Sequence, residues 1–408
     1  MRNKTLTYHK LCSILNIKLP HKYKDRFLST SKVKPKLAIV MTGGGARAAY
    51  QIGVLKAIAE MLPVGAPSPF TIVCGTSAGA INAASLAAKS DHFKNSVRRM
   101  HFVWSNFTSE QVFRTDLLGI AKTGAHWLLS MMMGGLGQHT PIYLLDRTPL
   151  RKLLEKYIDS SIFQDAINSN LLHALSINAT GYSSHQSVTF YHGHSTLKNW
   201  KRSQRLGVST RITVDHLMAS SAIPFLFAPV KLNREYFSDG SIRQTAPISP
   251  ALHLAADRVL VIGNHQTEPK LERVSNPKPP SLGAIAGHTL NSIFLDSLDA
   301  DIERLQRINK TVSLIGDSDK EKHGLTLRQI EVQVISPSDD IGKMAAEHAH
   351  ELPWSIKTLL RGIGAYSKTD SNFMSYLLFE KGYCNALIKL GYDDTVREKE
   401  NIMRFLRD

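Results

Sequence analysis

The residue best suited to chemistry in this 408-residue chain is Ser77, which stands between Gly75 and Gly79 in a Gly-x-Ser-x-Gly motif. An apolar run at 70–74 predicts a buried strand before the serine, and an Ala-rich segment predicts a helix after it. Such a turn is a nucleophile elbow, in which a strained serine points its hydroxyl outward and the glycines let strand and helix pass closely. The same motif also suits an ordinary turn whose serine caps a helix.

Three consecutive glycines, Gly43, Gly44 and Gly45, are a second candidate, because they connect a predicted strand to a predicted helix. Backbone N–H groups converge at such a loop and can hold a phosphate or an oxyanion. Gly43, Gly45 and Ala48 also match the dinucleotide fingerprint, which requires an acidic residue at the end of the following strand. That strand ends in the Ser77 motif instead. We therefore expect no nucleotide cofactor, and two neighbouring loops that share one site.

The serine needs a base, because its hydroxyl is a poor nucleophile at neutral pH. Asp239 and Gly240 follow a predicted strand at 235–237, so Asp239 could supply a carboxylate at the end of that strand. An Asp-Gly pair is also a common signal for a hairpin turn. A histidine, His265, follows another predicted strand at 258–263 and could complete a Ser-Asp-His triad.

The elements that must position these residues alternate along the chain, which predicts an α/β fold. Strand 36–41, helix 46–61, strand 70–74 and helix 78–89 imply parallel strands joined by helical crossovers. Most of 91–170 and the chain beyond about residue 340 read as helical. Further strands are predicted at 172–179, 187–191, 235–237, 258–263, 312–316 and 329–335.

Composition and charge limit the partners of the chain. The net charge is +16, and residues 1–36 contain ten Lys or Arg against one acid. A second basic stretch lies at 198–211. This charge favours anionic partners such as phospholipid headgroups, although a solvated tail explains the first stretch equally well. Aromatic residues are not interleaved with the basic ones, which argues against nucleic acid.

The chain shows no transmembrane segment and no secretory signal, so we expect a cytoplasmic protein that associates peripherally with a membrane. Its best apolar stretch, 125–136, is too short to span a bilayer. The three cysteines, Cys12, Cys74 and Cys384, are too far apart to suggest a metal site or a disulfide framework. We expect neither a metal nor a cofactor.

Four segments in this order resemble the patatin-like phospholipase family. The similarity covers roughly 36–263, and the tail is similar to that of a longer bacterial subgroup with a C-terminal extension. The resemblance implies a three-layer α/β/α fold with a central, mostly parallel sheet. The segments are Gly43-Gly44-Gly45-Ala46-Arg47, Gly75-Thr76-Ser77-Ala78-Gly79, Ala219-Ser220-Ser221-Ala222-Ile223-Pro224 and Asp239-Gly240-Ser241.

Composition, charge and the resemblance together predict four segments of the chain. A basic N-terminal arm occupies 1–35 and a catalytic core 36–265. A Pro-rich linker at 266–282 then leads to a mainly helical C-terminal region at 283–408, which could add strands to the core sheet.

By the same resemblance, the chain is a phospholipase A or lysophospholipase type of esterase that uses a Ser-Asp dyad and an acyl-enzyme. Ser77 would be the nucleophile and Asp239 the base. Backbone N–H groups of Gly43, Gly44 and Gly45, with that of Ala78, would hold the oxyanion.

Other positions of the motifs have supporting roles or depart from the family pattern. Arg47 would steady the glycine loop or meet a lipid phosphate, and Gly75, Gly79 and Gly240 are motif glycines. Two small-for-small departures, Ala48 and Ser241, are expected to alter substrate preference and not activity.

Two other classes of protein stay open at this point. One is an α/β-hydrolase esterase with His265 in a triad, although several strands normally precede the serine in that fold and here it follows the second. The other is a membrane-binding module without catalysis, which does not explain why Ser77 and Asp239 occur together. Phospholipid, lysophospholipid and neutral lipid all fit as substrates, and water or an alcohol fits as acyl acceptor.

Overall fold

The structure is a computed structural model that describes residues 35–116, 119, 143–263, 266, 279–294, 296–323, 327–366 and 371–407. Lys36–Asp408 forms one compact unit, and the account below concerns this unit. Three features of the sequence lie outside the described residues: positions 1–34 of the basic arm, the apolar stretch 125–136, and His265.

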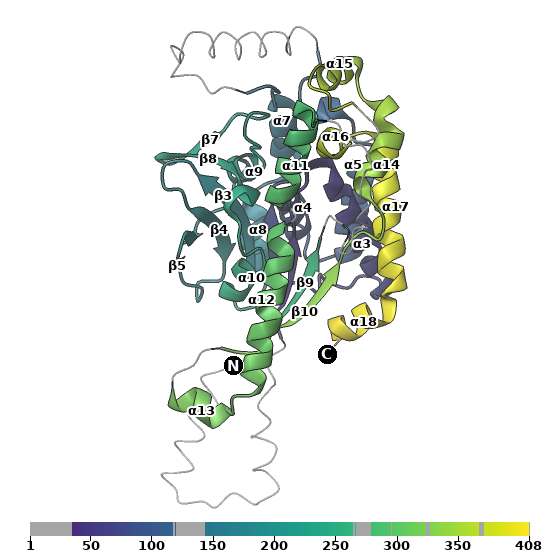
Figure 1. Cartoon of the computed structure of the whole chain (residues 1–408). Helices are drawn as coiled ribbons and strands as arrows, with labels where there is room; N and C mark the ends of the chain where they lie inside the picture. Colours follow the sequence, from purple (N-terminus) through teal and green to yellow (C-terminus); the bar gives the residue numbers. More distant parts are fainter. Residues whose placement is uncertain are drawn as a thin grey trace, which may run out of the picture. The chain divides into compact units, whose positions relative to one another are not determined.

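The core of the unit is a ten-stranded mixed sheet with the order β10-β9-β1-β2-β3-β4-β6-β5, to which β8 and β7 add beside β3 (Figure 1). The five strands from β10 to β3 run parallel, whereas β4 and β8 pair antiparallel with β3. The strands are β1 (Leu37–Met41), β2 (Ile72–Thr76), β3 (Ala174–Gly181), β4 (Ser187–Gly193), β5 (Trp200–Arg202), β6 (Arg205–Ser209), β7 (Val230–Leu232), β8 (Glu235–Asp239), β9 (Arg258–Ile262) and β10 (Glu331–Ile335).

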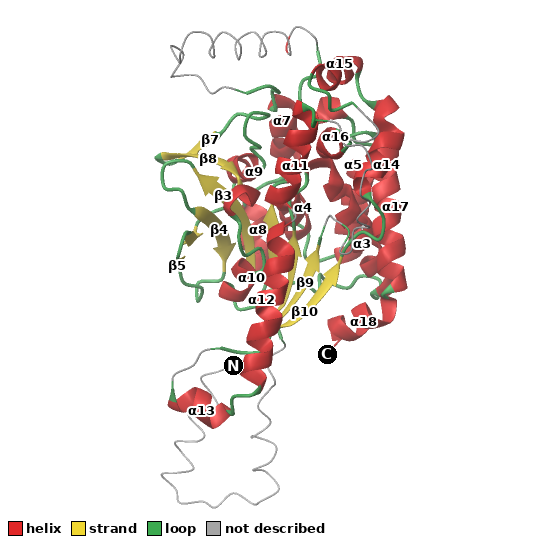
Figure 2. Cartoon of the chain, viewed as in Figure 1, coloured by secondary structure: helices red, strands yellow, loops and turns green. Residues whose placement is uncertain are grey.

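Helices flank this sheet on both sides (Figure 2). The α-helices described are α3 (Ala49–Met61), α4 (Ala78–Ala87), α5 (Phe93–Ser105), α7 (Thr148–Tyr157), α8 (Ser161–Asn168), α9 (Val214–Ser220), α10 (Ser249–His253), α11 (Leu282–Phe294), α12 (Asp296–Ser313), α13 (Asp317–Lys322), α14 (Ile341–His348), α15 (Trp354–Gly362), α16 (Asn372–Leu377), α17 (Lys381–Arg397) and α18 (Lys399–Arg407). Among them, no helix is both long and apolar enough to cross a membrane.

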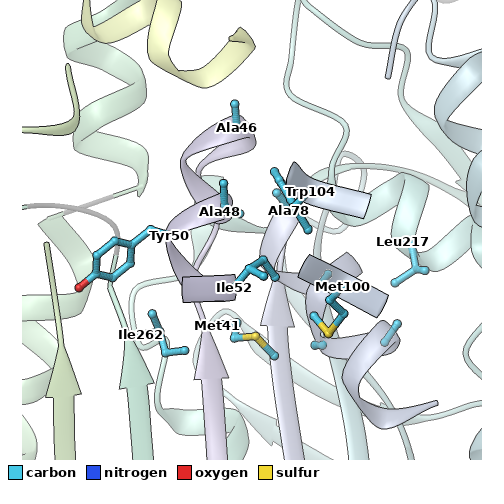
Figure 3. Packing of buried hydrophobic residues seen from close by; sticks show 14 of the residues in the cluster. Met41, Ala46, Ala48, Tyr50, Ile52, Ala78, Met100, Trp104, Leu217 and Ile262 are labelled. Atoms are coloured by element: carbon cyan, nitrogen blue, oxygen red, sulfur yellow. The ribbon is translucent and has the colours of Figure 1, made fainter. Parts of the chain in front are cut away.

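The side chains of the central strands alternate between two hydrophobic clusters, which makes the fold three-layered. In β1, Ile39 and Met41 join a cluster with α3, α4 and α5. Ala38 and Val40, which alternate with them along the strand, belong to a second cluster with α10 and α12. This alternation follows from the two-residue period of a strand that is covered on both faces. Figure 3 shows Met41 beside the side chains of α3. The predicted α/β/α fold is confirmed.

One predicted strand, 312–316, is wrong, because α12 continues through Ser313. Leu298, Leu305 and Val312 are spaced seven residues apart and all are buried, so they form one stripe of the helix. The short apolar run around Val312 was the end of this stripe. Leu314, just beyond the helix, is exposed.

The basic stretch 198–211 forms a hairpin at the edge of the sheet. Within it, β5 pairs antiparallel with β6, and sequence reasoning predicted neither strand. Lys201 and Arg202 are exposed on β5. Charged side chains on an outer strand discourage pairing with other chains, so part of the positive charge protects the sheet edge.

The C-terminal helix α17 packs unusually closely on α3, which ties the end of the chain to the core. A Cβ atom on Gly391 would lie 2.2 Å from the carbonyl oxygen of Tyr50, and one on Gly53 would lie 2.0 Å from that of Ile388. The Tyr50 hydroxyl donates to Asp394 on α17 at 2.9 Å. Only glycines permit the two helices to approach this closely.

We expect Gly391→Ala to lower the free energy of unfolding by about 1–3 kcal/mol, because the new methyl group must push α3 and α17 apart. Gly362→Ala is the matched control, since a Cβ at this position meets open space and alanine favours a helix. Unfolding in urea would measure both. Equal effects of the two substitutions would contradict this description of the contact.

Candidate active site

Ser77 lies at the turn between β2 and α4 in a backbone conformation that side-chain-bearing residues rarely adopt. Its φ is 56° and its ψ is −128°. The Ser77 N–H donates to the Oγ atom of Ser220 at 2.9 Å, while the Ser77 carbonyl accepts from the Ala80 N–H at 2.9 Å. A strained residue persists only where its surroundings hold it. Here the surroundings are the first turn of α4 and the end of α9.

The two glycines of the motif are required by close contacts. A Cβ atom on Gly75 would lie 2.4 Å from the carbonyl oxygen of Gly79, and one on Gly79 would lie 2.3 Å from that of Met41. The sequence predicted that these glycines let strand and helix pass closely. The packing of β1, β2 and α4 leaves no room for a side chain at either position.

Asp239 ends β8 and is almost completely buried, with 1% of its surface exposed. It does not begin a hairpin turn, because the chain continues into a short 3-10 helix at Gly240–Arg243. The Oδ1 atom of Asp239 accepts from the Ser241 N–H at 2.9 Å. Its Oδ2 atom is buried and has no well-aligned hydrogen bond among the described residues. Gly240 is also required, since a Cβ there would lie 2.2 Å from the Asn178 carbonyl oxygen.

The surroundings of Asp239 place its pKa where a general base can work. Burial raises the pKa of this carboxyl to about 6. The Ser77 hydroxyl, Ser241 and the positive charge of Arg147 each lower the pKa and so limit the rise. The carboxyl thus interacts with the serine hydroxyl, and it is ionised at neutral pH despite its burial.

Arg147 is a part of the site that sequence reasoning missed. The sequence pattern of 146–150 predicts only the start of a helix. It contains no motif that would connect Arg147 with Ser77. Arg147 is buried and donates to the Met218 carbonyl and the Ser221 Oγ atom, both at 3.0 Å. Burial lowers the pKa of this guanidinium, and the charge of Asp239 opposes that change. Arg147 is therefore a buried cation that favours the ionised form of Asp239.

The segment 220–222 connects these three residues. Ser220 accepts the hydrogen bond from Ser77, and Ser221 accepts one from Arg147. The next residue, Ala222, accepts from the Asp239 N–H at 2.9 Å. This segment belongs to the motif 219–224 that the sequence suggested, and its hydrogen bonds give the motif a physical reason.

The glycine loop presents backbone donors beside the serine. In the described part of the chain, the N–H groups of Gly44, Gly45 and Ala78 donate to no acceptor. Gly45 and Ala78 line the same cavity as Ser77. Gly43 has a different place, because a Cβ on it would meet Ser241 and Phe294.

Arg47 holds the glycine loop and does not face the cavity. It is buried, its Nε atom donates to Ser375 at 2.8 Å, and its guanidinium lies 4.0 Å from the ring centre of Tyr376. Gly45 (φ 58°) packs so closely on this segment that a Cβ would lie 2.2 Å from the Tyr376 carbonyl oxygen. Of the two predicted roles, this placement favours steadying the loop.

An apolar cavity of about 630 Å³ opens at Ser77. This volume is typical of a site for a small molecule. Every charged residue of its lining is a cation, and no described histidine contributes to it. The charged residues are Lys89, Arg98, Arg99 and Arg147, and apolar residues of the lining include Ile81, Met100, Val103, Leu150, Leu154, Ile223, Phe227 and Phe379.

Comparisons with known proteins give one matching family and several similar solved structures. A family model described as patatin-like phospholipase matches residues 39–252. VipD from Legionella pneumophila is a similar solved structure, with 13% identity, a TM-score of 0.37 and coverage of 90% of this chain and 67% of that chain. Human GIVD cytosolic phospholipase A2 has 12% identity, a TM-score of 0.44 and coverage of 91% of this chain and 60% of that chain.

A further similar structure is ExoU of Pseudomonas aeruginosa in complex with SpcU, at 13% identity and a TM-score of 0.25, with coverage of 84% of this chain and 70% of that chain. This chain spans 60% of the length of the human cytosolic phospholipase A2 chain. Comparison with curated proteins gave no match.

If Asp239 is the base of an ester hydrolysis, we expect kcat/KM to fall as the pH decreases through about 6, because only the deprotonated carboxyl accepts a proton. Arg147→Gln should move this acid limb to higher pH, since the charge that lowers the Asp239 pKa is removed. Arg151→Gln is the control, because Arg151 forms ion pairs with Glu155 and Asp215 on the surface. A pH profile of ester hydrolysis measures all three proteins. An acid limb near pH 4 in the wild type would contradict the role of burial.

Proposed function

This chain belongs to the patatin-like phospholipase family and is a lipid ester hydrolase, and we propose that it acts through a Ser77–Asp239 dyad and a covalent acyl-enzyme. The observation that carries the proposal is the Asp239 carboxyl, which is buried beside the Ser77 hydroxyl and keeps one oxygen without a well-aligned partner. A buried carboxylate oxygen without a well-aligned hydrogen bond is costly to maintain. Its presence at this position is explained if it takes the serine proton.

In the proposed reaction, Asp239 takes the proton of the Ser77 hydroxyl as the serine oxygen attacks the ester carbonyl. When the tetrahedral intermediate collapses, the ester C–O bond breaks and Asp239 returns the proton to the leaving alcohol. Water then loses a proton to Asp239 as it attacks the acyl-enzyme. The bond between the acyl group and the Ser77 oxygen then breaks, Asp239 returns its proton to that oxygen, and the fatty acid leaves. An alcohol in place of water would give acyl transfer by the same steps.

The oxyanion of both intermediates would be held by the N–H groups of Gly44, Gly45 and Ala78. The proposal is supported by the lack of other acceptors for these groups among the described residues and by the place of Gly45 and Ala78 in the cavity wall. Preorganised donors of this kind typically contribute a factor of ~10²–10³ each. Arg47 and α16 would keep the loop in place during the reaction.

Two alternative functions were open from the sequence. The catalytic triad depends on His265, which lies outside the described residues, and the His265→Ala control below distinguishes it from the dyad. A binding module without catalysis has no need for the strained backbone of Ser77 or for a buried carboxyl beside it. Both features destabilise the fold, and the dyad accounts for both.

We expect Ser77→Ala and Asp239→Asn each to lower kcat for a short-chain ester by about a thousandfold or more, because the two residues act as a unit. The assay is hydrolysis of p-nitrophenyl butyrate. Mass spectrometry after treatment with an alkyl fluorophosphonate should find one adduct, on Ser77.

His265→Ala is the control that separates a dyad from a triad, and it should retain activity. Near-complete loss of activity in a folded His265→Ala protein would refute the dyad. Equal rates for the wild type and Ser77→Ala would refute the serine mechanism.

We also propose that the enzyme works at anionic membrane surfaces, which the net charge of +16 and the ten basic residues in 1–36 support. Binding to phosphatidylglycerol vesicles should exceed binding to phosphatidylcholine vesicles and should weaken as salt is added. Co-sedimentation measures this binding. A protein that lacks 1–35 tests the arm: if its binding is unchanged, the arm is not the membrane anchor.

A further inference from the structure

The cavity at Ser77 follows one face of α4 along its whole length. The residues that α4 and its C-terminal turn contribute to the lining are spaced three, four or one apart, which is the pattern of a single helical face. The helix starts at the catalytic serine, so the distance along it is also the distance from the reacting atoms. These residues are Ala78, Ile81, Asn82, Ser85, Ala88 and Lys89.

Polar side chains along this face are satisfied by the protein and offer little to a polar ligand. Asn82 donates to Gln51 at 2.8 Å and accepts from Trp104 at 2.9 Å. The Ser85 hydroxyl donates to the Ile81 carbonyl at 2.8 Å. A ligand that enters between α4 and the apolar side chains of α5 and α7 therefore meets hydrocarbon along its path.

The apolar lining ends where cations begin. Lys89 follows α4, and Arg98 and Arg99 lie on the neighbouring α5. All three are exposed and line the cavity, and Lys89 lies just past the end of α4 that is far from Ser77. A methyl group that extends past Ala88 gains no further burial, because solvated cations replace the apolar wall.

We propose that this face of α4 is a ruler that selects esters of a single long acyl chain. From Ala78 to Ala88 the helix rises ~15 Å at ~1.5 Å per residue. The hydrocarbon core of a bilayer is ~30 Å thick, so one membrane-lipid acyl chain spans ~15 Å. An acyl group attached to Ser77 thus lies along α4 with its terminal methyl near Ala88. Ile81, Ser85 and Ala88 set the preferred length.

The inference rests on the proposed function, because an acyl-enzyme at Ser77 fixes which end of the acyl chain lies at Ala78. Its test therefore includes a binding measurement that does not require turnover. Ser85 lies ~10 Å along α4 from Ala78, so Ser85→Phe should block the channel beyond the length of an octanoyl chain. Ser85→Leu adds a smaller side chain and tests the same position if Ser85→Phe does not fold. Ser203→Phe is the matched control, because Ser203 is exposed in the turn between β5 and β6.

Turnover is measured as the ratio of kcat/KM for p-nitrophenyl palmitate to that for the octanoate, in the same detergent micelles. Ser85→Phe should lower this ratio at least about tenfold, since blocked methylenes of an apolar pocket typically cost ~10-fold or more. Ala88→Phe, at the end of the ruler, should lower it less. Ser203→Phe should leave the ratio unchanged.

Binding is measured by titrating palmitate and octanoate into Ser77→Ala proteins with and without Ser85→Phe. The added substitution should weaken palmitate binding at least about tenfold relative to octanoate. An unchanged relative affinity overturns the ruler, even if the enzyme is active. The opposite combination is also informative. If Ser85→Phe weakens palmitate binding as expected but Ser77→Ala hydrolyses esters as fast as the wild type, the ruler is supported and the proposed dyad is overturned.

Discussion

The hydrogen bond from the Ser77 N–H to Ser220 is the interaction on which the site depends. It holds a non-glycine residue at a φ of 56°, a conformation that a free chain avoids. The same short segment accepts from Arg147 through Ser221 and from the Asp239 backbone through Ala222. One turn at the end of α9 thus fixes Ser77, Asp239 and Arg147 relative to each other. A small shift of this turn would move all three.

Burial of Asp239 has opposite effects on stability and on reactivity. Desolvation disfavours the carboxylate and raises its pKa to about 6, which makes it a better proton acceptor than an exposed aspartate. Arg147 and Ser241 limit the rise, so the carboxyl is still ionised at neutral pH. The balance between a buried carboxyl and a buried arginine therefore sets the pH range in which Asp239 is ionised.

The C-terminal region completes the site, although the motifs lie far upstream. Arg47 and Gly45 pack on α16, and Phe379 contributes to the cavity wall. Close glycine contacts between α3 and α17 hold that region on the core. The helices beyond the sheet therefore have a role in keeping the glycine loop at the end of β1.

The sequence by itself determined the α/β class, the parallel order of the first strands and the family, because strand periodicity and glycine motifs are local patterns. It missed β5 and β6, whose charged residues lack an apolar alternation, and it misread the end of α12 around Val312. Only the tertiary structure decided that the charge of Arg147 acts on Asp239, that Arg47 turns away from the cavity, and that one face of α4 lines the cavity. These are contacts between segments distant in the chain, and burial, which sets the Asp239 pKa, exists only once those segments have packed.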